Sequence, residues 1–299
     1  MLSKEMWETL PKYAQFSYWF IRHDGDIWEI YAKKDNIVGE LVGTYDECTG
    51  IIKEAEGIAL TSDMPSAIVE DFNQFKLRPE YQVGKSVNME QLNMEEAVTL
   101  YETLLTGIIL IRANRSGAAD PDSAFNKFKQ ICLNWLRTTD MYTAPGSTRF
   151  HDSFAGGLLY HSLKVYNKAM ELTALPTFAT QSNILVDSVA LVALTHDWCK
   201  IDLYEPYMRN VKNDQTGKWE QVQEYKKNQR GVSLGHGVSS MFLASKCFKL
   251  TVQESIAIRW HMGFCRVADA DMDELQMSNE MYPLVHLLQF ADQLAIVNY

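Results

Sequence analysis

One stretch constrains the fold more than any other, an almost wholly apolar run that ends in polar residues, SVALVALTHDWCKID at 188–202. The polar residues His196, Asp197 and Lys200 continue the helical period of the apolar ones. Burying an imidazole, a carboxylate and an ammonium on such a face is costly unless the groups pair with one another or hold a metal. The stretch therefore predicts a buried helix whose end carries either a hydrogen-bonded structural cluster or a metal site.

The size and composition of the chain indicate an ordinary globular protein. Its 299 residues are 46% hydrophobic, enough for one large or two modest domains with a real core. No apolar run approaches the length of a membrane span, and the opening MLSKEMWETLPKY lacks the pattern of a signal peptide. We therefore expect a cytoplasmic protein with no membrane partner.

Cysteine usage and charge narrow the class of function. The five cysteines are scattered without a CxxC pair, which indicates free thiols rather than a zinc ribbon or a disulfide framework. The formal net charge of −10 disfavours sequence-independent adhesion to phosphate backbones, although it is compatible with a local basic groove. The acidic net charge therefore favours a protein that acts on a small molecule.

The apolar period changes near residues 85–95, which predicts a domain boundary there. Residues 16–43 read as strands around a turn at 23–26, where we expect His23 to be solvated, and residues 44–57 read as a helix. From Asn93 onward the pattern is helical, except for a β-hairpin inserted at about 207–227. We therefore predict a mainly α fold, with a small α+β module at 1–90 and a helical domain at 91–299.

Two further histidines lie in RFHDSFAGGLLYHSLKVYNKA, residues 149–169. His151 and His161 flank a Gly-Gly pair, and His161 falls on the apolar face of the helix that follows. A histidine in that position is either a satisfied core residue or a ligand, and the other histidines decide between the two.

The remaining candidates also fall on apolar helical faces. His236 opens a helix at 235–248, and His261 ends another, in which Thr251 and Glu254 form a capping-box pattern. Asp292 lies on an apolar face of the last helix. Imidazole nitrogens and carboxylate oxygens that point inward from several helices are typical of a divalent-metal site.

The order of these residues resembles that of the HD superfamily of metal-dependent phosphohydrolases, over roughly residues 120–299. The segment HDSFAGGLLYHSL resembles the H-x-x-x-x-GGL-x-x-H-[ST]-L motif of the branch that contains the YhaM-type 3′-end exoribonucleases. THDWCKI resembles the HD-x-x-K motif, and SLGHG resembles the GH element. The run from TAPGSTRFH through MRNVKNDQTGKW to AIRWHMG is also similar to a group of HD-family hydrolases from bacteria and phages.

The resemblance implies an HD-type helical bundle that holds two divalent metal ions, without distinguishing Mn, Mg, Fe and Ni. It assigns the ligands His161, His196, Asp197 and Asp292 to the first ion, and His236, His261 and a bridging Asp197 to the second. Such ions lower the pKa of a bridging water, so that hydroxide attacks phosphorus while the metals neutralise the phosphate oxygens. No nucleophilic side chain is then required.

Three other residues have two interpretations each. Lys200 stands one helical turn beyond His196 and either contacts a phosphate or pairs with a buried carboxylate. His151 is a substrate contact or a residue that supports a ligand. Arg149 is a phosphate clamp or an exposed arginine. We leave His286 out of the site, because it falls on a different helical face from Asp292.

The function that follows is a phosphohydrolase or phosphodiesterase, acting on a nucleotide or a short oligonucleotide. The hairpin gathers basic residues, which either form an anion-binding lid or are merely solvated. They are Arg209, Lys212, Lys218, Lys226, Lys227 and Arg230.

Two alternatives stay open. The first is a 3′-end exonuclease on single strands, in which hairpin aromatics stack bases rather than pack across the strands. These aromatics are Tyr204, Tyr207, Trp219 and Tyr225. The second is a non-catalytic nucleotide sensor that keeps the helical fold.

Overall fold

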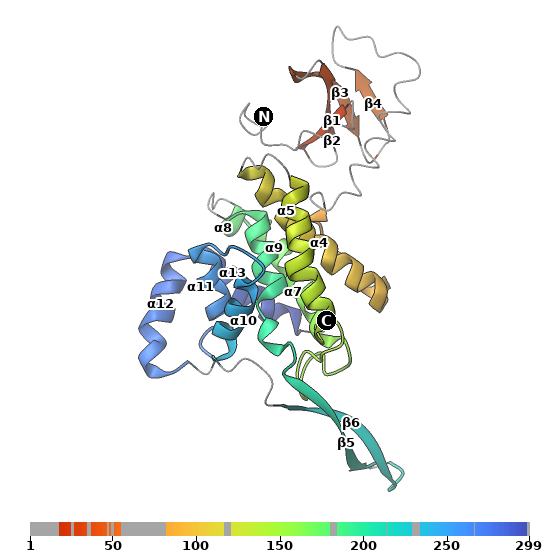
Figure 1. The fold of residues 1–299 in the computed structure, drawn as a ribbon, viewed down its shortest axis with the longest axis vertical. Helices are drawn as coiled ribbons and strands as arrows, with labels where there is room; N and C mark the ends of the chain where they lie inside the picture. Colours follow the sequence, from red (N-terminus) through yellow and green to blue (C-terminus); the bar gives the residue numbers. More distant parts are fainter. Residues whose placement is uncertain are drawn as a thin grey trace.

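The structure is a computed structural model. It describes residues 18–24, 27–34, 37–46, 48, 51–54, 82–116, 121–179, 184–213, 215–228, 234–265 and 267–297. Its described part is mainly helical, with two small antiparallel sheets (Figure 1). No helix among these residues is long and apolar enough to cross a membrane.

The N-terminal sheet has the strand order β1-β2-β3-β4, in which each strand is antiparallel to the next. The strands are β1 (Tyr18–Asp24), β2 (Ile27–Lys34), β3 (Ile37–Asp46) and β4 (Ile51–Glu54). The predicted hairpin is present, since β1 and β2 pair up to Asp24 and Ile27; His23 lies in β1, and residues 25 and 26 of the predicted turn lie outside the described residues. Trp28 and Ile30 are buried, which gives β2 one apolar face.

The helix predicted at 44–57 is wrong. Strand β3 extends to Asp46, and β4 pairs with it from Ile51 onward; residues 55–57 lie outside the described residues. The Asp46 carboxylate accepts a hydrogen bond of 3.0 Å from the backbone N–H of Cys48, which starts a turn in place of a helix. Ile51 and Ile52 are β-branched, and pairing with β3 outweighs the helical spacing of the acidic residues around them.

The helical part begins after a short helical turn at Met89–Gln91. Its elements, in chain order, are α4 (Met94–Arg115), α5 (Pro121–Phe128), a π-helical turn (Lys129–Leu133), α6 (Asn134–Thr138), α7 (Gly157–Thr173), α8 (Pro176–Ala179), α9 (Val186–Thr195), η3 (Trp198–Lys200), α10 (His236–Ser245), α11 (Val252–Trp260), η4 (Asp269–Asp271), α12 (Met272–Met281) and α13 (Pro283–Ala295). The predicted capping box is present at the start of α11, where Thr251 and Glu254 bond to each other's backbone N–H.

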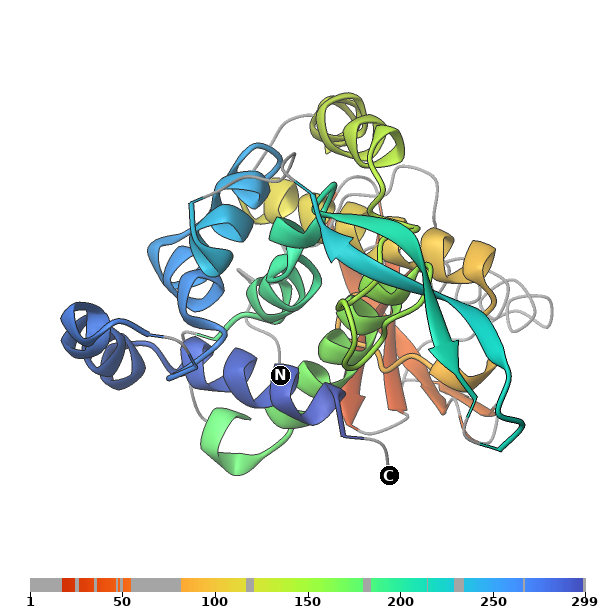
Figure 2. The ribbon, with the colours of Figure 1, turned by 90° about the horizontal axis from the view of Figure 1, so that it is seen from below.

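Helix α9 is the centre of the core. Every residue from Asp187 to Thr195 is buried, as the apolar run predicts. Helices α4, α7, α11 and α13 pack around it, and Figure 2 looks into this arrangement from below. Because α9 is covered on several sides, polar groups at its ends must find partners inside the protein.

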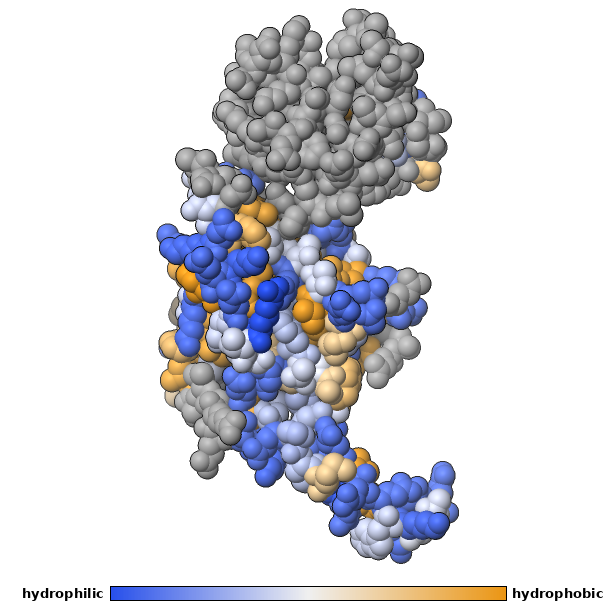
Figure 3. Space-filling model, turned by 45° about the vertical axis from the view of Figure 1, so that its right-hand side comes forward, coloured by the Kyte–Doolittle hydropathy of each residue, from blue (hydrophilic) through white to orange (hydrophobic). Residues whose placement is uncertain are grey.

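The second sheet is a two-stranded ribbon of β5 (Tyr204–Lys212) and β6 (Trp219–Lys227), which we call the arm. The Asn213 side chain accepts hydrogen bonds from the backbone N–H groups of Gln215 and Thr216 and so closes the turn between them. The arm extends away from the helices, and its surface is mostly hydrophilic with a few apolar side chains (Figures 1 and 3). From residue 82 onward, the described residues contain no other strand.

Candidate metal centre

The six predicted ligands converge in one place, although they come from five helices. They form two triads, His161, His196 and Asp292 in the first and Asp197, His236 and His261 in the second. Within each triad the nearest ligand atoms all lie within 4.8 Å of one another. His196 and Asp197 follow the last residue of α9, so the buried helix delivers one ligand to each triad.

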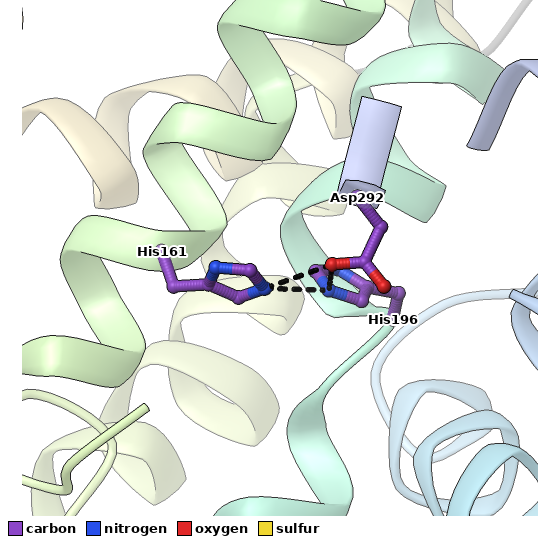
Figure 4. Close-up of side chains that lie close together, drawn as sticks. All are labelled: His161, His196 and Asp292. Carbon is purple, nitrogen blue, oxygen red and sulfur yellow. Dashed lines mark hydrogen bonds and ion pairs between the residues drawn. The ribbon is translucent and has the colours of Figure 1, made fainter. Parts of the chain in front are cut away.

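The side chains of the first triad lie close together (Figure 4). The Nε2 atom of His161 lies 3.1 Å from Asp292 Oδ1 and 3.3 Å from Nε2 of His196, and both histidines are fully buried. Two imidazole nitrogens that face each other at this distance repel, whether both carry lone pairs or both carry protons. A proton or a metal ion between them removes the repulsion.

The Asp197 carboxylate joins the two triads. Its Oδ2 lies 3.5 Å from Nε2 of His161 and 3.4 Å from Nε2 of His196. Its Oδ1 lies 2.9 Å from Nε2 of His236 and 3.6 Å from Nε2 of His261. One oxygen therefore faces each triad, which is the arrangement of a bridging carboxylate.

The ring orientation of two histidines is set by the helix ends that carry them. Nδ1 of His196 lies 2.8 Å from the carbonyl oxygen of Ala193, and Nδ1 of His261 lies 2.7 Å from that of Ile258. Because a carbonyl can only accept, each Nδ1 carries the proton, and in the neutral ring each Nε2 has a free lone pair. Nε2 of His261 is buried without a hydrogen-bond partner among the described residues, which suits a metal ligand.

A carboxylate that the sequence analysis missed supports His161. Oδ2 of Asp152 lies 3.4 Å from Nδ1 of His161, and its Oδ1 lies 2.5 Å from Nζ of Lys164. Asp152 has a left-handed backbone with φ of 52°, and its carbonyl approaches the start of α7 so closely that a Cβ on Gly157 would lie 1.9 Å from it. The second glycine of the Gly-Gly pair is therefore required for this carboxylate to reach the site.

A thiol that the sequence analysis also missed contacts His236. The Sγ atom of Cys199 lies 3.0 Å from Nδ1 of His236, and the backbone N–H of Cys199 donates to the hydroxyl of Ser240 at 3.0 Å. Helix α10 can approach α11 closely enough for His236 to reach the centre because Gly237 has no side chain. A Cβ there would lie 2.0 Å from the carbonyl oxygen of Arg259.

The carboxylates stay ionised despite their burial. Burial alone would raise the pKa of Asp197, but Lys200 and His196 outweigh it and hold this pKa well below its usual range. Burial also acts to raise the pKa of Asp292, but hydrogen bonds from His161 and His196 keep it well below its usual range. Asp197 in turn raises the pKa of His196, and that of His236, to about 10 against the effect of burial. The centre thus attracts positive charge, which protons or metal ions can supply.

Lys200 forms a salt bridge to a buried carboxylate, which is the second of the two roles considered for it. Its Nζ lies 2.6 Å from Oδ2 of Asp197, and the Asp197 charge raises the pKa of Lys200 to about 12 although burial acts to lower it. His151 lies beside the centre, with its ring centroid 5.0 Å from that of His161, but it belongs to neither triad. It is half-buried, and burial lowers its pKa, with His161 and Lys200 adding to the effect.

The predicted phosphate contacts Arg149, Arg209 and Lys212 belong to neither triad. Arg149 is 63% exposed and lies 4.0 Å from Glu224, and Arg209 forms a 2.8 Å ion pair with the same carboxylate. Lys212 is the last residue of β5, at the far end of the arm. Glu224 therefore offsets the charge of both arginines, of Arg209 across the ribbon and of Arg149 from the segment before α7. His286, which stacks on Phe290, stays outside both triads as expected.

The spacing of the donor atoms fits metal coordination. Two ligands bound at about 2.1 Å are about 3.0 Å apart at a right angle and about 3.4 Å apart at the tetrahedral angle. The distances of 3.1, 3.3 and 3.7 Å within the first triad lie close to this range. Imidazole together with carboxylate suits Zn, Fe, Mn or Ni.

No family model, no curated protein and no solved structure matches this chain.

Proposed function

We propose that this chain is a metal-dependent phosphohydrolase or phosphodiesterase of HD type, acting on a nucleotide or a short oligonucleotide. The observation that carries the proposal is the Asp197 carboxylate, which presents one oxygen to each of the two triads. A purely structural cluster has no need of four histidines whose Nε2 atoms converge on two carboxylates. Two ions, when bound, would activate water and neutralise phosphate oxygens.

The chain's own residues then have distinct tasks. His161, His196 and Asp292 hold one ion and His236 and His261 the other, with Asp197 shared. Lys200 fixes the Asp197 carboxylate and balances part of its charge. His151 is a polar side chain beside the centre that belongs to neither triad, so it is placed to contact the substrate or to move a proton to the leaving oxygen.

The test is hydrolysis of a simple phosphodiester and of a panel of nucleotides, with manganese, magnesium, iron or nickel added. Wild type should release product only with metal. Asp197→Asn should lose turnover and metal together, whereas Lys200→Ala should keep its metal and turn over more slowly. Asp269→Asn is the matched control, because this carboxylate is exposed and belongs to neither triad. Metal-independent turnover, or full activity in Asp197→Asn, would refute the proposal.

A further inference from the structure

The two faces of the arm differ in charge. Side chains alternate along each strand, so the even-numbered residues of 204–212 and the odd-numbered residues of 219–227 share one face. The charged residues of this face are Lys212 and Lys227, and it contains neither Asp nor Glu. We call it the acid-free face. The opposite face carries Glu205, Glu220 and Glu224 together with its own cations.

The charges of the opposite face compensate one another. Lys226 pairs with Glu205 at 3.0 Å, and Arg209 pairs with Glu224 at 2.8 Å. Within the described part of the chain, neither lysine of the acid-free face forms an ion pair. In a protein with a net charge of −10, a surface that carries only positive charge is suited to an anionic partner.

The acid-free face also exposes groups that recognise bases. Trp219 is 71% exposed and Met208 is 56% exposed, and Trp219 lies directly across the ribbon from Lys212. The amide side chains of Asn210, Gln221 and Gln223 are exposed between them on the same face. An aromatic ring next to cations and amides is typical of single-stranded nucleic-acid binding. The described turn residues 213 and 215–218 are polar or glycine.

The acid-free face begins at the metal centre. Tyr204 is its first residue. The backbone N–H of Leu203, directly before it, donates to the carbonyl of Lys200 at 3.2 Å, and Nζ of Lys200 lies 2.6 Å from the Asp197 carboxylate. The nine residues of β5 then lead away from the centre over roughly 27 Å, at about 3.4 Å per residue. A mononucleotide in the centre cannot reach Trp219. At about 3.4 Å per stacked nucleotide, a strand of about eight nucleotides spans that length.

We propose that the acid-free face of the arm binds the single-stranded extension of an oligonucleotide whose terminal phosphodiester lies in the metal centre. The proposal rests on the proposed function for the reacting end, and it adds the substrate class: a single strand rather than a free nucleotide. The lysines contact phosphates, Trp219 stacks on a base, and the amides bond to base edges without fixing one sequence.

The experiment is fluorescence anisotropy of a labelled 12-nucleotide oligo(dT) with the full chain in the presence of a chelator, so that binding is measured without hydrolysis. Trp219→Ala should weaken binding by about five- to a hundredfold, since stacking contributes about 1–3 kcal/mol per base. Trp219→Phe should retain most of the affinity. Lys212→Gln should also weaken binding and reduce its salt dependence by about one phosphate contact.

Val222→Ala is the matched control, because this residue is 43% exposed on the opposite face of the same ribbon. Its affinity should equal that of wild type. The proposal is overturned if wild type does not bind the 12-mer, if Val222→Ala and Trp219→Ala weaken it equally, or if a trinucleotide binds as tightly. It is also overturned if the arm binds phosphatidylserine vesicles or a polyglutamate peptide in preference to the oligonucleotide. Arm-dependent binding without hydrolysis in any metal would refute only the proposed function, and hydrolysis without arm-dependent binding would refute only the inference.

Discussion

Helix α9 buries charged side chains at both of its ends, and the two groups differ in how completely they are paired. At its start, the buried carboxylates of Asp187 and Glu254 meet the guanidinium of Arg112, which lies 2.9 Å from Asp187. Arg115 also pairs with Asp187, and Ser188 donates its hydroxyl to Glu254. Two carboxylates and two guanidinium groups leave no net charge, and this network joins α4, α9 and α11.

At the end of α9, the pairing is incomplete. Asp197 has Lys200, but the four histidines around it turn their Nε2 atoms toward one another and toward two carboxylates. Nε2 of His261 is buried without a hydrogen bond among the described residues. The comparison shows that buried charged side chains do not by themselves identify a functional site. A closed network fixes helices, whereas converging ligand atoms with unmet bonding capacity fit an ion.

The largest expected effect lies in the closed network. Arg112→Leu should lower the free energy of unfolding by about 3–5 kcal/mol, because it leaves two buried carboxylates short of a partner. The loss, measured by urea denaturation, should be the same with and without manganese. Arg137→Gln is the control, since its pair with Glu102 is half exposed and should contribute less than about 1 kcal/mol. Equal losses in the two variants would contradict the comparison.

A metal-dependent effect, smaller for each site, is expected at the open end. Manganese at a hundredfold excess over its dissociation constant should stabilise wild type by about 2.7 kcal/mol for each site that only the folded state binds. The double variant His161→Ala/His261→Ala removes one ligand from each triad and should lose most of this gain in a thermal-shift titration. If its gain matches that of wild type, the triads are not where metal binds.

Asp152→Asn should leave the fold intact and weaken metal binding at the first triad by about 10- to 100-fold, the usual effect of removing a carboxylate that orients a ligating histidine. The measurement is a manganese titration by calorimetry. Lys164→Gln separates the two roles of Asp152: it removes the ion pair but keeps the carboxylate beside His161, and should weaken binding less. The opposite order of the two variants would assign Asp152 to structure.

The smallest effect is expected at Cys199. Cys199→Ala removes the thiol that contacts His236 and should weaken metal at the second triad by less than about tenfold, because a water can replace the hydrogen bond at this 36% exposed histidine. Cys199→Ser should restore most of the affinity. The control is Cys132→Ala, since Cys132 is buried and belongs to neither triad. A larger loss in Cys132→Ala than in Cys199→Ala would show that packing accounts for the effect.

The sequence predicted the parts of the molecule that depend on local periodicity. The burial of α9, the capping box at Thr251 and the arrival of His236 at the start of a helix all follow from spacing along one segment. The prediction of a helix at 44–57 was wrong because this segment pairs as strands β3 and β4, and such pairing depends on contacts that local periodicity does not show. Glu224, on β6, likewise lies beside Arg149 and Arg209. Spacing along the chain does not reveal these contacts.

The set of side chains that cluster could be predicted, but the residues that support them could not. The six candidate ligands stand out because histidine and aspartate are unexpected on apolar faces. Asp152 reaches His161 only through a left-handed backbone and a close approach to Gly157, and the contact of Cys199 with His236 depends on how α10 packs. The sequence does place a carboxylate directly after His151. The direction in which the Asp152 side chain points, however, depends on the backbone conformation of the turn.

The central claim is that two triads share Asp197 and together hold two ions. Equilibrium dialysis against manganese, with metal counted per chain, tests it most directly on wild type, His236→Ala and Asp197→Asn. We predict two ions in wild type, one in His236→Ala, and less than one in Asp197→Asn while its circular dichroism stays that of wild type. A folded Asp197→Asn protein that retains two ions, or a wild type that binds none, would contradict the account.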